Sequence, residues 1–388
     1  MQFKHISGCL LFAILACSPS KSIVHTTTSS YSVPPPSPLP DAPKPHQVKN
    51  IIFMIGDGMG LTQITAGMIS NDYTLNLEQF KSIGLHKSYS FNNLITDSAA
   101  GATAFSIGRK TFNGAIGVGQ DTIPYLTILQ QASQRGMVTG LVATSTIVHA
   151  TPAAFIAHNW SRNDYEGIAS EFLSGHLDCF IGGGKKYFTR RKDEVDLYQS
   201  LRNKGYQISD YLDGEINNIN IISNKFGFLT ADGDPLPVSQ GRDYLSDASM
   251  KAIQHLDKQN KGFFLMIEGS QIDWGGHANN ANYVVTEMLD FDKTIGRVLE
   301  WVKQNGNTLL IVTADHETGG LSINEGTTMD SLVTKFTTDK HTGTLIPVFA
   351  YGPGEELFRG IYENTAIYQK MKAAYGWPLG PSIKLSLK

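Results

Sequence analysis

Residues 262–277 of the chain read GFFLMIEGSQIDWGGH. The run Gly262–Ile267 is almost entirely apolar, and a short apolar run bounded by glycine and charged residues predicts a strand buried on both faces. Polar residues follow it directly, because Glu268, Asp273 and His277 all carry side chains that can bind a metal ion. In parallel sheets, ligands bind at the carboxyl ends of the strands. The stretch therefore predicts one strand of such a sheet, with chemistry at its carboxyl end.

Five other short apolar runs resemble this strand, and longer amphipathic stretches separate them. The other predicted strands are Val48–Ile55, Met137–Ala143, Asp178–Ile181, Thr308–Thr313 and Leu345–Tyr351. The predicted helices are Ile123–Arg135, Pro152–His158 with Thr151 as its N-cap, Asp243–Gln259 and Asn280–Gln304. Alternating strands and helices predict an α/β fold, namely a three-layer α/β/α sandwich around a mostly parallel central sheet.

The composition is that of an ordinary globular protein. The chain has 388 residues, of which 41% are hydrophobic and 17% charged, with a net charge of −3. Nucleic-acid-binding domains need a basic surface, so we expect no nucleic-acid-binding role.

The N-terminus resembles an export signal. Residues 1–17 combine Lys4 with an apolar run from Cys9 to Ala16, which is too short to span a membrane. The end of this run resembles a bacterial lipoprotein box, in which Cys17 would be acylated; the alternative is a plain cleaved signal. We expect an exported protein, periplasmic or anchored to the outer membrane of a bacterium only through a lipid on Cys17.

A linker and one domain follow the signal. Residues 18–46 are rich in Ser, Thr and Pro and cannot bury a core, so they predict a tether. Residues 47–388 then form the predicted catalytic domain. Its one cysteine is Cys179, which excludes a disulfide within the domain.

Three further polar motifs lie next to predicted strands. Asp57 follows the first strand between two glycines, Asp315 and His316 follow Thr308–Thr313, and His341 precedes the last strand. Each could be structural, since an Asp between glycines is a common turn. Their joint placement nevertheless indicates one site.

A fourth motif surrounds Ser98. The small residues after it predict a helix that begins at this serine. The N-terminus of a helix offers free N–H groups and a positive dipole end, which suit a phosphate. The alternative is an ordinary N-cap at Asp97 or Ser98.

The candidate ligands fall into two chemical groups. Imidazole and carboxylate together suit zinc, whereas the oxygen donors Thr151 and Glu268 suit magnesium. The candidate zinc ligands are Asp57, Asp273, His277, Asp315, His316 and His341.

These motifs resemble the alkaline phosphatase family over nearly all of the chain from Lys49 to Gly352. The most specific stretches are Asp97–Ala99 with Lys110–Ala115, Glu268–His277, Thr313–Gly320 and His341–Gly343. The resemblance implies a phosphoric monoester hydrolase with an alkaline pH optimum, in which Ser98 forms a phosphoserine intermediate. It also implies a homodimer that acts on small phosphate monoesters.

The resemblance further implies three metal sites. Asp273, His277 and His341 would hold one Zn²⁺. Asp57, Asp315 and His316 would hold a second Zn²⁺ facing Ser98. Asp57, Thr151 and Glu268 would hold one Mg²⁺. Arg162 matches the arginine that binds the phosphate, although on sequence alone it would be interpreted as a surface residue.

Two residues near the substrate depart from the best-studied bacterial members, which have Asp and Lys where this chain has His149 and Trp274. The combination resembles a branch of small bacterial enzymes that includes marine and cold-living species. Since imidazole favours zinc over magnesium, His149 leaves open whether the third ion is Zn²⁺. Trp274 removes a cation, which predicts weaker binding of product phosphate.

Two other kinds of function agree with parts of this pattern. A related phosphodiesterase, phosphonate hydrolase or sulfatase is the nearest alternative, but a sulfatase motif is absent around Ser98, and phosphodiesterases commonly use a Thr nucleophile. A lipoprotein that binds phosphate without turnover is another. A missing nucleophile or a broken ligand set would favour it, and the sequence shows neither.

Overall fold

The computed structural model describes residues 48–328 and 331–385. The predicted signal peptide at 1–17 and the predicted linker at 18–46 lie outside the described residues and stay predictions. Within the described part of the chain, no helix is both long and apolar enough to cross a membrane.

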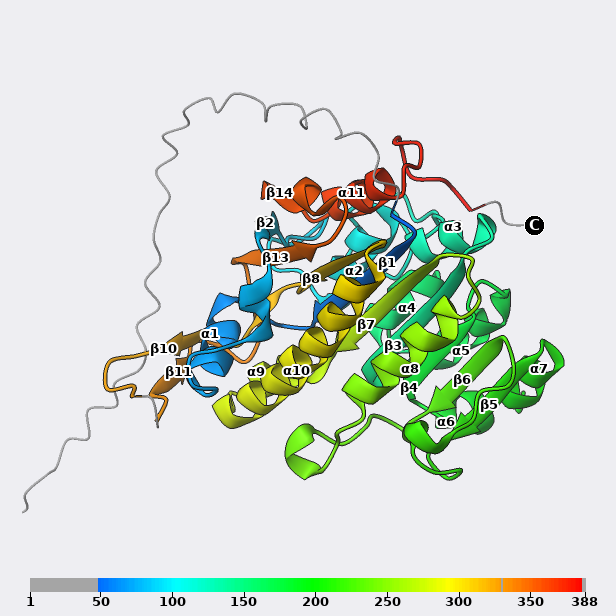
Figure 1. Cartoon of the computed structure of the whole chain (residues 1–388), viewed down its shortest axis with the longest axis horizontal. Helices are drawn as coiled ribbons and strands as arrows, with labels where there is room; N and C mark the ends of the chain where they lie inside the picture. The colour runs from blue at the N-terminus through cyan, green and yellow to red at the C-terminus, as the bar shows by residue number, and fades with distance from the viewer. Residues whose placement is uncertain (1–47, 329–330, 386–388) are drawn as a thin grey trace, which may run out of the picture. The chain divides into compact units, whose positions relative to one another are not determined.

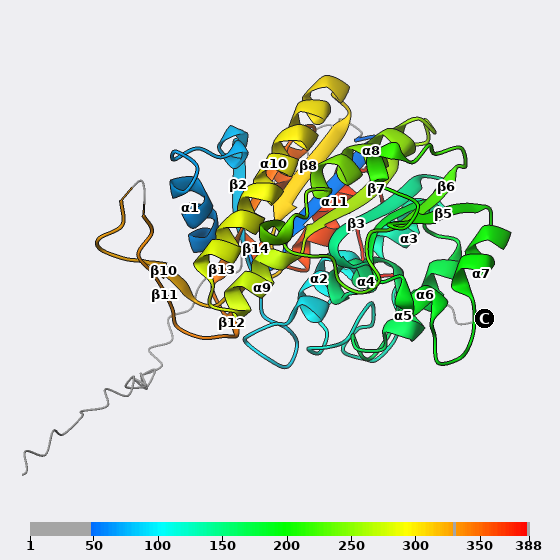
Figure 2. The same cartoon turned by 90° about the horizontal axis from the view of Figure 1, so that it is seen from below.

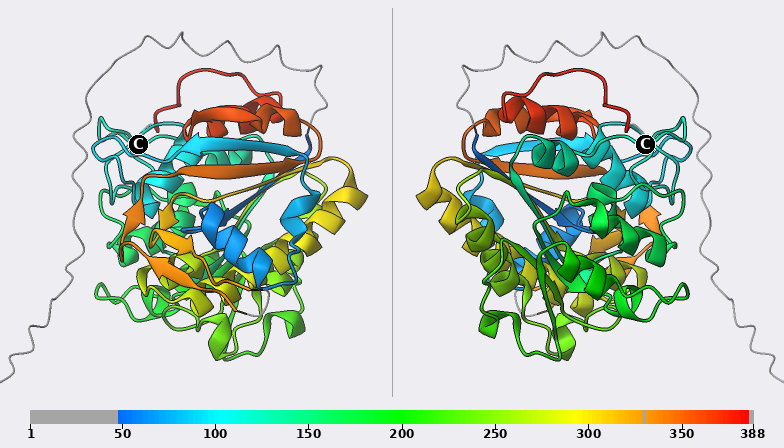
Figure 3. Two further views of the ribbon diagram at one scale, coloured as in Figure 1. Left: turned by 90° about the vertical axis from the view of Figure 1, so that its left-hand side faces the viewer. Right: turned by 90° about the vertical axis from the view of Figure 1, so that its right-hand side faces the viewer.

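A ten-stranded sheet forms the centre of the described residues, in the order β14-β2-β13-β8-β1-β7-β3-β4-β6-β5 (Figure 1). Its strands are β1 Asn50–Gly56, β2 Ser82–Lys87, β3 Val138–Thr146, β4 Cys179–Gly183, β5 Tyr206–Asp210, β6 Lys225–Leu229, β7 Phe263–Gly269, β8 Thr308–Thr313, β13 Leu345–Tyr351 and β14 Gly360–Glu363. All neighbouring pairs are parallel except those of β13, which runs antiparallel to β2 and β8. Figure 3 shows β2 and β13 side by side, although they are far apart in the sequence.

Helices cover both faces of this sheet. They are α1 Leu61–Ile69, α2 Ser98–Ile107, α3 Ile128–Gln134, α4 Ala150–Ile156, α5 Tyr165–Glu171, α6 Lys186–Thr189, α7 Leu197–Asn203, α8 Leu245–Asp257, α9 Gln271–His277, α10 Ala281–Asn305 and α11 Ala366–Ala374. Figure 2 shows α8 and α10 above the sheet and α2, α4 and α5 below it. The three-layer α/β/α sandwich predicted from the sequence is therefore confirmed.

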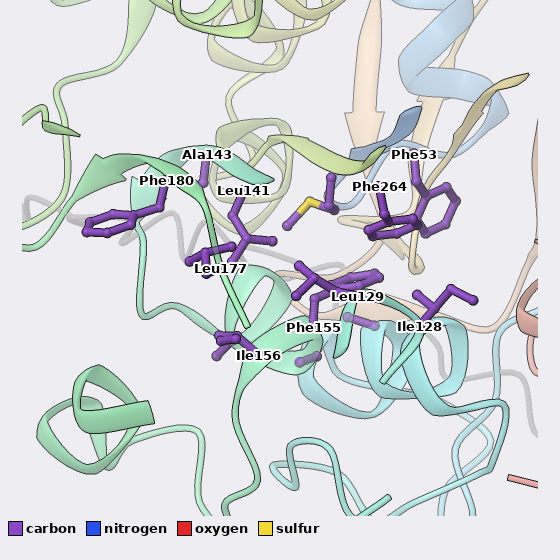
Figure 4. Packing of buried hydrophobic residues seen from close by; sticks show 14 of the residues in the cluster. Phe53, Ile128, Leu129, Leu141, Ala143, Phe155, Ile156, Leu177, Phe180 and Phe264 are labelled. Carbon is purple, nitrogen blue, oxygen red and sulfur yellow. The ribbon is translucent and has the colours of Figure 1, made fainter. Parts of the chain in front are cut away.

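Two hydrophobic cores separate the three layers. The core beneath the sheet joins α2, α3, α4 and α11 to the strands, and the core above it joins α1, α8 and α10. In Figure 4 the rings of Phe53 on β1, Phe264 on β7 and Phe155 on α4 come together. The Phe155 ring centroid lies 6.0 Å from that of Phe53 and 5.9 Å from that of Phe264. This packing fixes α4 against the central strands.

Three predicted helix starts were wrong, and one of them is that of α8, which begins at Leu245 rather than Asp243. The helix predicted at Ile123–Arg135 is α3, which begins at Ile128 because Thr127 caps it. The Thr127 hydroxyl accepts a hydrogen bond from Gln130 N. The helix predicted at Pro152–His158 is α4, whose N-cap is His149. Thr151 is therefore a residue of the helix and not its cap, which leaves the threonine hydroxyl free for another role.

Two small antiparallel pairs lie outside the main sheet. β10 Leu321–Ile323 pairs with β11 Thr334–Phe336, and β9 Glu317–Thr318 pairs with β12 His341–Thr342. The second pair matters for the site, because it brings His341 back beside the chain that leaves β8. The carboxyl ends of β8, β1, β7 and β3 are adjacent in the sheet order, and the candidate residues collect there.

Candidate metal centre

Asp57 follows β1 and lies in a sharp turn. Gly58 has a φ of +72°, and a Cβ added to it would lie 2.7 Å from the Cα of Asp273. Only glycine accommodates both the left-handed backbone and this close approach. The turn buries Asp57 completely, against the helix that carries Asp273.

Ser98 is the first residue of α2, and the sequence-based prediction of a helix start is correct here. Asp97 is the N-cap, and its Oδ1 accepts a hydrogen bond of 3.0 Å from Ala100 N. The Oγ of the buried Ser98 lies 3.2 Å from Nε2 of His316. The small residues of α2 allow this approach, since a Cβ added to Gly101 would lie 3.0 Å from the Cβ of Asp315.

The first group of candidate ligands consists of Asp273, His277 and His341. Nε2 of His277 lies 3.1 Å from Nε2 of His341 and 3.3 Å from Oδ2 of Asp273. Nε2 of His341 lies 3.5 Å from Oδ1 of Asp273. The other ring nitrogens lie 2.7 Å from Asp339 O and 2.8 Å from Thr96 O, so backbone carbonyls orient both imidazoles.

A second group surrounds His316. Its Nε2 lies 3.5 Å from Oδ1 of Asp57 and 3.3 Å from Oδ2 of Asp315. Asp57, Asp273 and His316 each place one donor atom within 4.8 Å of the others. Asp273 therefore lies between the first and second groups.

A third group consists of Asp57, His149 and Glu268, whose donor atoms also lie within 4.8 Å of one another. The resemblance assigns Thr151 to this site, and its buried hydroxyl comes from the first turn of α4, just after His149. The sequence analysis linked His149 to the identity of the third ion without naming it as a ligand, and the structure places its imidazole in the third group. Its N-cap position explains its placement.

Arg162 lies in the loop between α4 and α5, and its guanidinium points to the centre. Nη1 donates a 3.0 Å hydrogen bond to Oδ2 of Asp97, and Nη2 lies 3.4 Å from Nε2 of His149. The ring of Trp274, on α9, meets that of His149 edge to face at 6.1 Å. The structure thus brings together every site residue predicted from the sequence.

In the absence of bound cations, burial changes the pKa values of the acidic residues of the metal centre. It raises the pKa of Glu268 to about 8, against the hydroxyls of Ser270, Thr151 and Ser145, which act to lower it. Burial and the charge of Asp273 raise the pKa of Asp315 to about 7. Burial, and then the charge of Asp315, raises the pKa of Asp57 well above its usual value.

The pKa values of the imidazoles in the metal centre shift in both directions. Burial lowers the pKa of His149 to about 3, and it also lowers the pKa values of His316 and His341. The hydrogen bond to Asp273 raises the pKa of His277. Burial acts to raise the pKa of Asp273, but the three neighbouring imidazoles hold it below its usual range.

Several buried oxygen atoms of the centre have no hydrogen-bond partner among the described residues. They are both carboxylate oxygens of Asp57, Oε1 of Glu268, Oδ2 of Asp315 and Oγ1 of Thr151. Leaving such atoms unpaired is costly in a protein interior, whereas a cation would satisfy all of them. The carboxylate and imidazole donors therefore fit metal ions.

Three contacts of the centre were not predicted from the sequence. They are the Arg162–Asp97 ion pair, the Thr318 hydroxyl that donates to Asp273 Oδ1, and the Ser145 hydroxyl 3.4 Å from Oε2 of Glu268. Asp97 and Thr318 lie inside the motifs that suggested the site, so motif membership is a signal for them. No sequence pattern singles out Ser145.

Known proteins resemble this chain over most of its described length. The family profile described as "Alkaline phosphatase" matches residues 48–335 and 331–377. Alkaline phosphatase 3 of Bacillus subtilis (strain 168) is 31% identical, over 89% of this chain and 93% of the relative. Alkaline phosphatase 4 of the same bacterium is 33% identical, over 82% of this chain and 87% of the relative.

Solved structures of alkaline phosphatases also resemble this chain. That of the alkaline phosphatase from the Antarctic bacterium TAB5 is 44% identical and has a TM-score of 0.80, covering 87% of this chain and all of that one. Two structures of variants of that enzyme, with one histidine replaced by aspartate or glutamate, have magnesium bound in the M3 site.

The fold and the site define a metal-binding hydrolase of the α/β class. The chain belongs to the alkaline phosphatase family. Family membership supports phosphomonoesterase activity, so the chain is an enzyme whose expected substrates are phosphate monoesters.

Proposed function

We propose that the enzyme hydrolyses phosphate monoesters through a phosphoserine at Ser98, with an alkaline pH optimum and with two Zn²⁺ and one Mg²⁺ per chain. The observation that carries the proposal is the convergence of three ligand groups on one nucleophile. Ser98 Oγ lies beside His316, at the helix N-terminus and within the same cluster as the buried carboxylates that have no partner.

The ligand sets proposed are those that the resemblance implies. Asp273, His277 and His341 form one zinc site, Asp57, Asp315 and His316 the other, and Asp57, Thr151 and Glu268 the magnesium site. When bound, the metal ions would supply positive charge that lowers the pKa of hydroxyl groups and stabilises charge on the reacting oxygens.

The residues of the chain carry out the rest of the reaction. Ser98 Oγ forms a bond to phosphorus, and the ester P–O bond breaks to release the alcohol. Water then attacks phosphorus, and the Oγ–P bond breaks to release phosphate. The free N–H groups of α2 and the planar guanidinium of Arg162 hold the non-reacting phosphoryl oxygens. Asp97 fixes that guanidinium through its 3.0 Å contact with Nη1.

An alkaline optimum has a basis in the first ligand group. His277 must lose its proton to bind a cation. Its hydrogen bond to Asp273 raises its pKa, so this step is favoured at higher pH.

The identity of the third ion depends on His149. The magnesium-bearing variants of the Antarctic enzyme replace a histidine by a carboxylate. We propose that His149 occupies that position here, in which case its imidazole favours zinc at the third site.

The remaining parts of the proposal concern the whole chain. Residues 47–388 form the catalytic domain, and the enzyme is an exported homodimer, either periplasmic or anchored to the outer membrane through Cys17. A non-catalytic role as a phosphate-binding protein is disfavoured because Ser98, Arg162 and all candidate ligands lie together. No observation favours a phosphodiesterase or a sulfatase.

The test is hydrolysis of p-nitrophenyl phosphate at alkaline pH by the parent and by Ser98→Ala, with radiolabelled substrate to trap a phosphoenzyme. We expect rapid turnover by the parent, a loss of at least about 10³-fold in Ser98→Ala, and label bound covalently only to the parent. Turnover without a dependence on Ser98 would overturn the proposed intermediate. No turnover by the metal-loaded parent would overturn the proposed function.

A further inference from the structure

The side chains of the metal centre differ in their exposure to solvent. The side chains of Asp57 and His316 are completely buried, as are Glu268 and Thr151. Other side chains of the site are partly exposed: that of His277 is 37% exposed and that of Arg162 is 21% exposed. The alcohol part of a monoester whose phosphate is held by Arg162 must therefore leave the centre past these residues.

Three aromatic rings lie on the loops that lead to Arg162 and its neighbours, and we name Phe91, Phe112 and Trp160 the aromatic rim. The Phe91 and Phe112 ring centroids are 5.2 Å apart at an interplanar angle of 84°, and those of Phe112 and Trp160 are 6.3 Å apart at 42°. Trp160 and Phe91 are each 49% exposed. The rings thus contact one another while a large part of their surface faces water.

The rim is attached directly to the phosphate-binding residues. Trp160 precedes Arg162 by two residues, and Arg162 N donates a 2.8 Å hydrogen bond to Gly114 O, just after Phe112. Gly114 N in turn donates to Oδ2 of Asp97, the carboxylate that fixes Arg162. The segments that carry the rings are therefore hydrogen-bonded to the residues that would hold the phosphate.

Backbone and side-chain hydrogen bonds hold the rim in place despite its exposure. Phe91 N donates to Thr111 O at 2.9 Å, which joins the loop after β2 to the loop after α2. Asn113 accepts a hydrogen bond from Asp97 N and donates one to Ile95 O. Both loops are drawn in cyan near α2 at the lower edge of Figure 2. Exposed aromatic rings on a rigid support are typical of a binding surface for apolar groups.

Apolar character continues from the rim toward the first ligand group. Leu94 is 78% exposed, and Ile95 lies beside it. The next residue, Thr96, holds His341 through its carbonyl. Apolar residues therefore lie in the segments next to both Arg162 and His341.

We propose that the aromatic rim is a specificity-determining surface that contacts the alcohol part of the substrate and favours aryl and other large apolar monoesters over small alkyl ones. The inference rests on the proposed function, because Arg162 must hold the phosphate. Of the three rings, that of Trp160 should contribute most to this preference, since Trp160 lies closest to Arg162 in the chain. Ring-to-ring contact with an aryl group supplies the preference.

The test compares 2-naphthyl phosphate with ethyl phosphate in the metal-loaded parent and in Trp160→Ala. We expect kcat/KM for the naphthyl ester to fall about five- to tenfold, mainly through KM, with little change for the ethyl ester. Inhibition by inorganic phosphate should stay unchanged, because phosphate has no alcohol part. Trp160→Phe should retain most of the preference.

Ile361→Ala is the matched control, because this exposed side chain lies on the edge strand β14 and should affect neither ester. Equal losses for both esters, or no loss for either, would overturn the inference while leaving the proposed function intact. A change in oligomeric state in Trp160→Ala without a change in preference would also overturn it, and would assign the rim to an interface between copies of the chain. A parent that hydrolyses neither ester would overturn the proposed function and the inference together.

Discussion

Among the described residues, two clusters of buried acidic side chains differ in how their charge is compensated. In the first, Arg242 forms ion pairs with Glu287 and Asp290, the second at 2.9 Å. Arg242 Nε also donates to Leu236 O, and Glu287 accepts from Val238 N at 2.8 Å. All three charged side chains have partners, and the cluster fixes the loop before α8 to α10.

In the metal centre the corresponding partners are missing. Both oxygens of Asp57 and one oxygen each of Glu268 and Asp315 are buried with no hydrogen bond from the described residues. Arg162 is the cation that approaches them, and its ion pair is with Asp97 instead. A cluster that compensates its own charge is structural, whereas one that does not indicates a bound cation. The comparison therefore separates scaffold from site by hydrogen-bond partners and not by residue type.

The largest expected effect comes from Asp57→Asn, since Asp57 lies in two of the three ligand groups. We expect kcat/KM to fall by at least about 10³-fold, because charge stabilisation in the centre is lost. The matched control is Asp290→Asn in the Arg242 cluster, which should keep most of the activity. Similar activities of the two variants, measured with p-nitrophenyl phosphate, would contradict the distinction between the clusters.

Arg242→Met should act mainly on stability. It leaves Glu287 and Asp290 buried without their cation, which costs about 3–5 kcal/mol in a buried ion pair. Urea unfolding measures this loss, and adding Glu287→Leu and Asp290→Leu should recover much of it. Arg297→Met is the surface control, because its pair with Asp247 is largely exposed and contributes no more than about 1 kcal/mol. Equal destabilisation by both arginine variants would show that the Arg242 cluster is not special.

The pH dependence of stability should differ between the metal-free and metal-loaded protein. The pKa values of Glu268 and Asp315 are raised to about 8 and about 7 in the folded chain, so the folded state binds these protons more tightly than the unfolded state. Their contribution is fully present below the ordinary carboxyl pKa near 4 and is lost as pH rises toward 8. The lowered pKa values of His149, His316 and His341 act in the opposite direction up to the ordinary histidine pKa near 6.5, so EDTA-treated protein should unfold at progressively lower urea concentration from about pH 7 to pH 8. Parallel pH profiles with and without metal would contradict this interpretation.

Trp274→Lys should have the smallest effect. A lysine places one cation near the bound phosphate, and one added charge is worth roughly 1 kcal/mol, or about fivefold, at a distance of 4 Å in water. We therefore expect inorganic phosphate to inhibit this variant more strongly than the parent. If the inhibition constants are the same, Trp274 does not account for weak product binding.

The central strands could be predicted from the sequence because their side chains are buried on both faces. Thr308–Thr313 and Leu345–Tyr351 have the predicted bounds. The strands β2, β5, β6 and β14 were missed. β2 and β5 alternate between buried and less buried residues over five or six positions, and β14 has four residues that are exposed or half-buried. Such short strands are defined by their neighbours in the sheet, which a local pattern does not contain.

The features of the site also divide into those that the sequence predicts and those that it does not. The ligand types could be predicted because they lie in short polar motifs next to predicted strands and helices. The Arg162–Asp97 pair and the role of Thr318 could not, since each depends on distances between segments far apart in the chain. The Arg242 cluster was also missed, because its arginine looks like any other charged residue in a polar stretch.

The central claim is that the buried carboxylates without partners form a metal centre that drives catalysis. The most direct test is elemental analysis of the purified protein together with its activity, before EDTA treatment, after it, and after restoration of zinc and magnesium. We predict two zinc ions and one magnesium ion per chain, or a third zinc in place of magnesium, with activity lost and regained in step with metal content. Asp57→Asn should retain less metal, whereas Asp290→Asn should retain all of it. Full activity in a protein shown to be free of metal would contradict the account.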